Sequence, residues 1–204
     1  MITPIEIFLK NITMCREISS LYDHLISSVG SVFCFDDILR IQVVNSVSAI
    51  DRFIHDLIRT GIMDMFIGNK APTDKYLNEP ITLKVHHELV DSMAMFNYTN
   101  VMVFEKYIIE KFKIFSFEDP DKISDGLSYI WNEKHKWQKI ANFIALDERY
   151  VRTKLKLIVS RRNGIVHESD RDYTGTKIPI DKVDCDEIVL FIENCGKAIF
   201  NLAL

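Results

Sequence analysis

The sequence contains few of the residues that interrupt helices. Among its 204 residues there are 7 Gly and 5 Pro, whereas 48% of the residues are hydrophobic. A sandwich or barrel of short strands needs frequent Gly- and Pro-rich turns, so this composition favours long helices. The length suits one domain, or one domain with an appendage, and it allows a sizeable hydrophobic core. We therefore expect an all-α fold.

Other absences exclude further classes of protein. The four cysteines form no C-x-x-C pair and no histidine lies at zinc-ligand spacing from them, so we expect buried or idle thiols in a reducing compartment. No window approaches the roughly 18 to 20 apolar residues of a membrane span. The N-terminal residues lack the cationic and apolar regions of a signal peptide. These features predict a soluble, cytoplasmic protein that does not enter a membrane.

The net charge of the chain excludes a protein that binds nucleic acid over its whole surface. The formal net charge is -4 and the sequence pI is about 5.9, so an anionic partner would have to meet a local basic patch. Residues 149–162 form such a strip, with six basic side chains and no acidic one. A charge run is usually a solvated helix face, and binding of phosphate groups is the alternative.

Hydrophobic periodicity and capping signals place the helices. Thr3, Pro4 and Glu6 predict the start of a helix that ends near Gly30. Further helices are expected over 38–62, 98–117 and 148–166 and from 181 onward, and Asp36 or Asp37 is expected to cap the second one. Residues 81–90 fit either a strand or a helix, and their surroundings favour a helix.

The stretch "RRNGIVHESD", residues 161–170, places an arginine within an apolar helix face. At about 100° per residue, Arg162 lies in the middle of the stripe formed by the apolar residues of 151–166. An unpaired guanidinium in an apolar interior costs several kcal/mol, so Arg162 needs a carboxylate, a facing groove or a phosphate. A structural role, in which Arg162 pairs with backbone carbonyls or with a carboxylate such as Asp51, remains open from the sequence.

The residue types also suit phosphodiester chemistry. His167 can transfer a proton near neutral pH, and Arg162 can bind a phosphate through two N–H groups. This pair requires neither a metal nor another cofactor, and the sequence offers no convincing carboxylate cluster for a metal. Asp51, one turn from His55, is a candidate to orient Arg162 or His167. Glu168 is a further candidate, at the edge of a cleft that would receive the phosphate. The candidates for RNA binding are Arg161, Arg152 and Lys156.

The segment "RRNGIVHE" resembles the R-x4-6-H motif of the HEPN superfamily (higher eukaryotes and prokaryotes nucleotide-binding domains), in the form Arg-Asn-x-x-x-His. Arg162, Asn163 and His167 match it, and the asparagine favours Arg162 over Arg161. "DDILRIQVVNSVSAIDRFIHDLI", "APTDKYLNEPITL" and "LKLIVSRRNGIVHESD" are similar to the RiboL-PSP-type HEPN branch in order and spacing. The resemblance covers roughly residues 36–203. It leaves 1–35 as an N-terminal helical extension packed on a HEPN-like domain of residues 36–204.

The resemblance implies an antiparallel helical bundle that dimerises through its motif-bearing helices. It further implies a metal-independent endoribonuclease that leaves 2′,3′-cyclic phosphate ends, with Arg162, Asn163 and His167 as catalytic residues. Such proteins often act in prokaryotic toxin–antitoxin or antiviral defence, so the expected partners are RNA, a second copy and an antitoxin or defence-system protein.

Alternatives from other functional classes stay open. One is a non-catalytic HEPN module for dimerisation or for RNA or nucleotide binding that serves a partner protein, and a nucleotide sensor is a weaker possibility. Toxins of this branch that pair with a nucleotidyltransferase antitoxin carry a modified tyrosine two residues after the histidine. Ser169 stands there, so the resemblance does not extend to that form of regulation.

Overall fold

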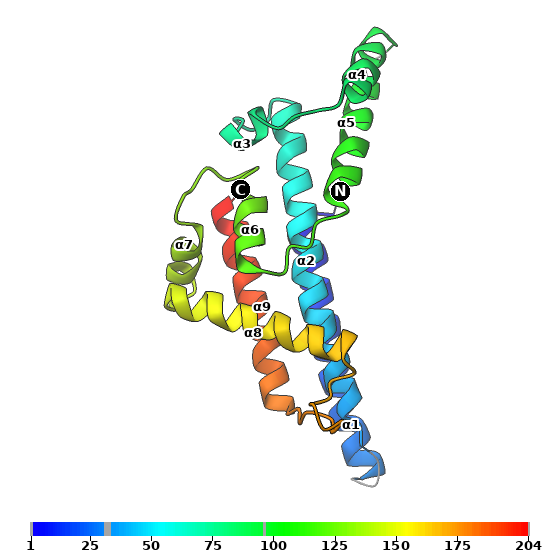
Figure 1. The fold of residues 1–204 in the computed structure, drawn as a ribbon, viewed down its shortest axis with the longest axis vertical. Coiled ribbons are helices and arrows are strands. Elements are labelled where there is room, and N and C mark those ends of the chain that lie inside the picture. Colours follow the sequence, from blue (N-terminus) through cyan, green and yellow to red (C-terminus); the bar gives the residue numbers. More distant parts are fainter. Residues whose placement is uncertain (1, 31–33, 96, 204) are drawn as a thin grey trace.

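The computed structural model describes residues 2–30, 34–95 and 97–203. The regular structure of these residues is helical, with an isolated β-bridge between Arg171 and Lys177 (Figure 1). The predicted all-α fold is confirmed. The helices are α1 (Pro4–Val29), α2 (Asp36–Phe66), α3 (Asp74–Leu77), α4 (Leu83–Met95), α5 (Asn97–Phe112), α6 (Pro120–Leu127), α7 (Lys136–Phe143), α8 (Glu148–His167) and α9 (Lys182–Ala203).

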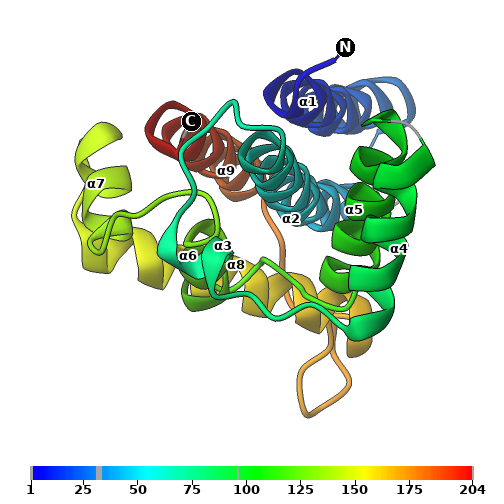
Figure 2. The same ribbon diagram turned by 90° about the horizontal axis from the view of Figure 1, so that it is seen from above.

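Helix α2 forms the centre of the molecule. It packs against α1, α5, α6, α8 and α9, and the view from above shows it surrounded by most of these helices (Figure 2). A helix that is packed on several sides must be apolar over most of its circumference. Helix α2 meets this condition through a long series of side chains that are at most 1% exposed, which includes Ile50, Ile54, Leu57, Ile58 and Ile62.

Helix α1 begins as its sequence predicts. Thr3 and Glu6 form a capping box, Pro4 occupies the first turn, and the chain leaves the helix at Gly30, whose φ of 74° favours glycine. The ring of Phe8 lies 4.7 Å from that of Phe53, so α1 contributes to the main hydrophobic core. The division into an extension of residues 1–35 and a domain of residues 36–204 stays a prediction.

Two predicted helix boundaries are wrong. Asp36 and Asp37 lie in the first turn of α2 and neither is its N-cap residue, because Phe35 takes that place. The helix predicted over 98–117 ends at Phe112 instead. The chain leaves the helix after Phe112, and two side chains of α2 bind its backbone at Phe115 and Phe117. The ambiguous residues 81–90 belong for the most part to α4, so the preference for a helix there is confirmed.

Helices α4 and α5 form a hairpin that projects from the body as an arm (Figure 1). Its base packs on α2, and its far end extends well beyond the other helices in this view. None of the helices in the described ranges combines the length and the hydropathy that a membrane-spanning segment requires.

Candidate active site

Helix α8 carries the motif and crosses the front of the bundle (Figure 1). Asp147 caps it by accepting a hydrogen bond from the backbone N–H of Tyr150 at 3.0 Å. The helix is anchored by Val151, Leu155 and Ile158, whose exposed fractions are 0%, 0% and 4%. It persists to His167, so the whole motif lies on one regular helix.

Arg162 follows the buried stripe of α8 and pairs with Glu118, a residue from the segment between α5 and α6. Its Nη2 lies 3.0 Å from Oε1 of Glu118, and Nη1 donates to Oε2 at 3.4 Å. The Arg162 side chain is 21% exposed and that of Glu118 11%. Burial raises the pKa of Glu118, whereas the positive charge of Arg162 opposes that shift and the negative charge of Asp51 adds to it.

The pairing leaves the Nε edge of the Arg162 guanidinium without an acceptor among the described residues. Nη1 donates to Oδ1 of Asn163 at 2.9 Å and to Glu118. Nη2 faces Glu118 with one of its two N–H groups. The Nε–H is buried and has no hydrogen-bond partner among the described residues. Nε–H and the second N–H of Nη2 lie on the same edge, which has the geometry for a bidentate contact with a phosphate.

Helix α2 holds the backbone that carries Glu118. The backbone N–H of Phe117 donates to Oδ1 of Asp51 at 2.5 Å, and Nε2 of His55 lies 3.2 Å from the carbonyl oxygen of Phe115. The His55 ring also meets the Phe117 ring edge-on at 4.7 Å. Asp51 therefore supports the site through the 113–119 segment, whereas the carboxylate that contacts Arg162 is Glu118.

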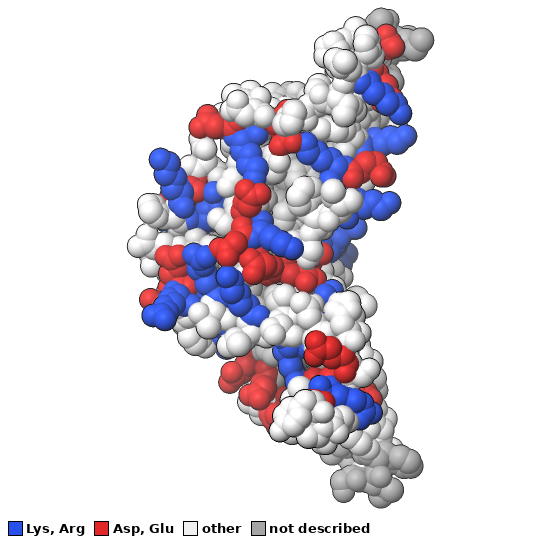
Figure 3. All heavy atoms as spheres, in the orientation of Figure 1, with Lys and Arg blue, Asp and Glu red and all other residues white. Residues whose placement is uncertain are grey.

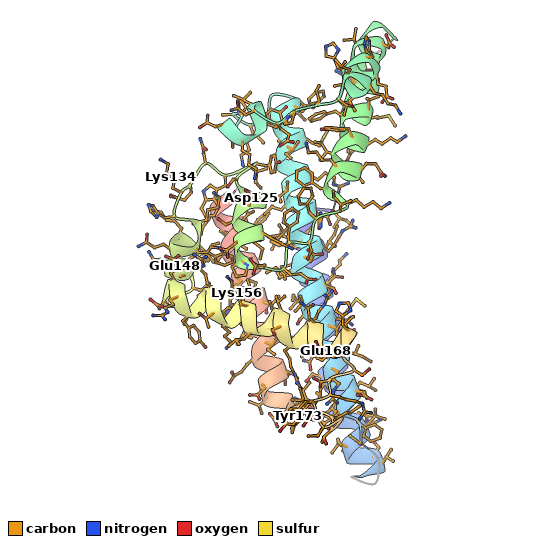
Figure 4. All side chains as sticks on the ribbon, in the orientation of Figure 1. Asp125, Lys134, Glu148, Lys156, Glu168 and Tyr173 are labelled. Carbon is orange, nitrogen blue, oxygen red and sulfur yellow. The ribbon has the colours of Figure 1, made fainter. Side chains whose placement is uncertain are left out.

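His167 is the last residue of α8 and is exposed. Within the described ranges its side chain makes no hydrogen bond or ion pair. Five helical positions separate it from Arg162, which places the two side chains roughly 140° apart around the helix axis. Glu168 is the exposed C-cap residue, and Figure 4 shows it at the end of α8. One chain therefore does not direct Arg162 and His167 to the same face.

A buried ion-pair cluster fixes the chain directly after His167. Asp170 is 1% exposed and accepts from Nε of Arg40 at 2.6 Å, while Nη1 of Arg161 lies 2.7 Å from its other oxygen. The backbone N–H of Asp170 donates to the carbonyl oxygen of Gly164 at 2.9 Å. Arg161, predicted to contact RNA, is thus held in a contact that joins α8 to α2.

The comparison with known families agrees with the motif. Residues 11–204 match the family model described as RiboL-PSP-HEPN. The chain belongs to the RiboL-PSP-HEPN family. The match includes the whole motif, so the family resemblance inferred from "RRNGIVHE" is confirmed, and it identifies the chain as a HEPN module of nuclease or RNA-binding type. No curated protein and no solved structure matches the chain.

The six basic side chains of residues 149–162 do not share one face of α8: Arg161 and Arg162 make the contacts described above, whereas Arg152 and Lys156 lie on its outer side. Arg152 and Lys156 both pair with Asp121, at 2.5 and 3.0 Å, and their side chains are 36% and 49% exposed. Acidic side chains lie among the basic ones over this face, so the strip does not form a continuous positive surface (Figure 3). Lys156 is near the middle of α8, well separated from Glu168 at its end (Figure 4).

Sequence reasoning missed Glu118. Its segment, "FSFEDPDK", contains the irregular residues before α6, and no periodicity relates them to α8. Only the tertiary contact with Arg162, 44 positions away in the sequence, identifies the role of Glu118. Within the described residues, no group of three or more His, Cys, Asp or Glu side chains is arranged to hold a metal ion.

Proposed function

We propose that this chain is a metal-independent endoribonuclease of the HEPN type. The observation that carries the proposal is the state of Arg162: Glu118 and Asn163 hold it in place, and its buried Nε–H has no acceptor in the part of the chain that the structure describes. A buried N–H without a partner is unfavourable, and a phosphate oxygen that reached this edge would satisfy it. The same helix ends at a histidine that is exposed to solvent.

The reaction assigns a separate role to each motif residue. His167 removes the proton from a ribose 2′-hydroxyl, and the 2′-oxygen attacks the adjacent phosphorus. The bond to the 5′-oxygen breaks, that oxygen takes up the proton from the protonated imidazole of His167, and a 2′,3′-cyclic phosphate remains. Arg162 stabilises the negative charge that accumulates on the phosphate oxygens, and Asn163 keeps the guanidinium oriented. Each step uses side chains of this family motif alone.

We further propose that the active form is a homodimer. Arg162 and His167 point to different faces of one α8, so two copies whose α8 helices face each other would combine an arginine and a histidine from different chains. Arg152 and Lys156, on the exposed side of the same helix, would contact RNA beyond the cleaved bond. Analytical ultracentrifugation tests the dimer, and a stable monomer at micromolar concentration would contradict it.

The biological setting is proposed from the family. RiboL-PSP-HEPN membership favours a role in a prokaryotic toxin–antitoxin or antiviral defence system, in the cytoplasm, with an antitoxin or defence-system protein as a further partner. Co-purification from the native host with its neighbouring gene products would identify that partner.

The decisive experiment is RNA cleavage in the presence of EDTA. Total tRNA and a long unstructured RNA are incubated with the wild-type chain and with His167→Ala, and the product ends are mapped. Cleavage by the wild type alone, with cyclic phosphate ends, supports the proposal. Equal cleavage by both proteins indicates a contaminating nuclease. No cleavage by a folded, dimeric wild type contradicts the proposal for the isolated chain.

One observation favours a second candidate function. The mixed charges over α8, visible in Figure 3, and the net charge of -4 provide little general attraction for RNA. A non-catalytic HEPN module that dimerises, or that binds RNA or a nucleotide for a partner protein, is consistent with this surface. A nucleotide that remains bound through purification, together with an inactive site, would support it.

A further inference from the structure

A groove of about 350 Å³ lies between α2 and α5, next to the candidate active site. Asp51 belongs to its wall and also binds the backbone of Phe117, the neighbour of Glu118. His55 belongs to the same wall and contacts the carbonyl oxygen of Phe115. In both ribbon views, α5 and the C-terminal end of α8 lie on the same side of α2 (Figures 1 and 2). The groove therefore lies beside the backbone segment that carries Glu118, the partner of Arg162.

Three basic side chains line the rim of the groove, two of them paired with carboxylates. Arg52, Arg59 and Lys113 line it, and the Arg52 side chain is 66% exposed. Asp56, a carboxylate of the lining, is 4% exposed and lies between the two arginines, with its oxygens 2.8 Å from Nε of Arg52 and 3.4 Å from Arg59. Arg59 also pairs with Glu105. In Figure 3 the outline of the molecule is concave below the α4–α5 arm, and basic side chains lie along that edge.

The floor of the groove is apolar, and an exposed aromatic ring stands beside it. Ile108, Ile109 and Phe112 supply the floor. The Phe115 ring, 46% exposed, lies 5.7 Å from the Phe112 ring and is stacked on Phe117 at an interplanar angle of 6°. A flat exposed ring next to cationic side chains is the arrangement with which proteins bind unpaired bases.

We propose that the α2–α5 groove, together with Phe115, binds a nucleotide of single-stranded RNA adjacent to the phosphate held by Arg162. The base stacks on Phe115, and Arg52 and Lys113 contact the flanking phosphates. This inference rests on the proposed function, because it assumes that RNA reaches Arg162. The inference specifies the form of RNA that binds. The nucleotide in the groove must be unpaired, because a base in a duplex does not expose its face to an aromatic ring.

Binding of a fluorescent, unstructured oligoribonucleotide to the His167→Ala protein tests the stacking. Phe115→Leu keeps an apolar side chain but removes the ring, so the Kd rises at least about fivefold, whereas Phe115→Tyr retains the wild-type value. Phe143→Leu is the matched control, because Phe143 is a similarly exposed ring (52%) on α7. A Kd that is unchanged in Phe115→Leu, or equally raised in Phe143→Leu, overturns the inference.

The salt dependence of binding tests the phosphate contacts. Lys113→Ala lowers the slope of log Kd against log salt concentration by about one, as for the loss of one phosphate contact. Lys139, an exposed lysine on α7, provides the control variant Lys139→Ala, whose slope equals that of the starting protein. Equal slopes for the two variants would place the bound strand elsewhere.

The experiments distinguish an error in the proposed RNA-binding groove from an error in the proposed nuclease activity. If the wild type cleaves RNA and Phe115→Leu cleaves it with the same KM and kcat, the proposed binding in the groove is wrong and the proposed nuclease activity is supported. Weaker binding by Phe115→Leu without cleavage by any variant supports the groove and contradicts the nuclease. Sedimentation tests whether a second copy of the chain, instead of RNA, occupies the groove. If Phe115→Leu converts a dimer into a monomer, the surface is an interface between copies and the inference is wrong.

Discussion

Replacing Asp170 by asparagine tests whether one buried carboxylate fixes the end of α8. Asparagine has nearly the same size, and it tolerates the left-handed backbone conformation that Asp170 adopts, with φ of 54°. The substitution therefore keeps the shape of the side chain but removes its charge and replaces one of its two acceptor oxygens by an N–H donor. Arg40, 5% exposed, and Arg161 then lose the anion that they share.

The expected loss of stability follows from the burial of Arg40. Removing one partner of a buried ion pair costs about 3–5 kcal/mol, because the other charge remains buried without compensation. Arg40 keeps a contact with the carbonyl oxygen of Ile178 at 2.7 Å and one with Asp37 at 3.2 Å. We therefore expect Asp170→Asn to lower the free energy of unfolding by about 3 kcal/mol, at the lower end of that range.

Urea unfolding, followed by far-UV circular dichroism, measures the change. The control is Asp91→Asn, at an exposed carboxylate that forms no ion pair among the described residues; its stability should stay within about 0.5 kcal/mol of the wild type. Combining Asp170→Asn with Arg40→Met should restore part of the loss, because the uncompensated charge is then absent. A loss below about 1 kcal/mol for Asp170→Asn, or a double variant less stable than that single variant, would refute the reasoning.

Three further predictions concern other parts of the structure. Glu118→Gln removes the charge that orients the motif arginine, so the kcat for RNA cleavage should fall about tenfold or more, and an unchanged kcat would exclude that role. Gly126→Ala should destabilise the fold by about 1–3 kcal/mol in urea unfolding, because the added Cβ would meet a phenylalanine ring at 2.4 Å, whereas Gly164→Ala, in open space on α8, should stabilise it by up to about 1 kcal/mol. Cys34 is exposed and should react rapidly with a thiol reagent in the native protein. Burial raises the pKa of the other three thiols to about 11, 12 and 12, so rapid reaction of more than one thiol would contradict the buried positions of Cys15, Cys185 and Cys195.

The sequence predicted those features of the fold that depend on local interactions. Thr3, Pro4 and Glu6 form the first helix cap because hydrogen bonds within one turn decide it. The helix predicted over 148–166 follows likewise from its apolar periodicity, and α8 extends one residue further, to the motif histidine. The end of α5 was predicted five residues too late, since the apolar residues of 113–117 continue a helical pattern while contacts with Asp51 and His55 hold that backbone in another conformation.

The candidate site was predictable only in part for the same reason. Arg162 could be recognised as a charge within an apolar stripe, and the need for a partner followed from the cost of burying it. The identity of that partner could not be derived, because Glu118 lies in an irregular segment whose position is set by distant contacts. Asp51 was a reasonable candidate from helix geometry. It does not contact Arg162 but accepts a hydrogen bond from the backbone N–H of Phe117, the residue before Glu118.

The contacts of α2 connect the groove to the motif. Asp51 and His55 line the groove and also bind the backbone of 115–117, which leads directly to the carboxylate on Arg162. A nucleotide in the groove would therefore touch the same side chains that hold Glu118 in place. Because that carboxylate fixes one edge of the guanidinium, correct placement of a base would favour the orientation in which the remaining edge meets the phosphate. Binding of the neighbouring nucleotide and orientation of the motif arginine would then be coupled through a single pair of residues on one rigid helix.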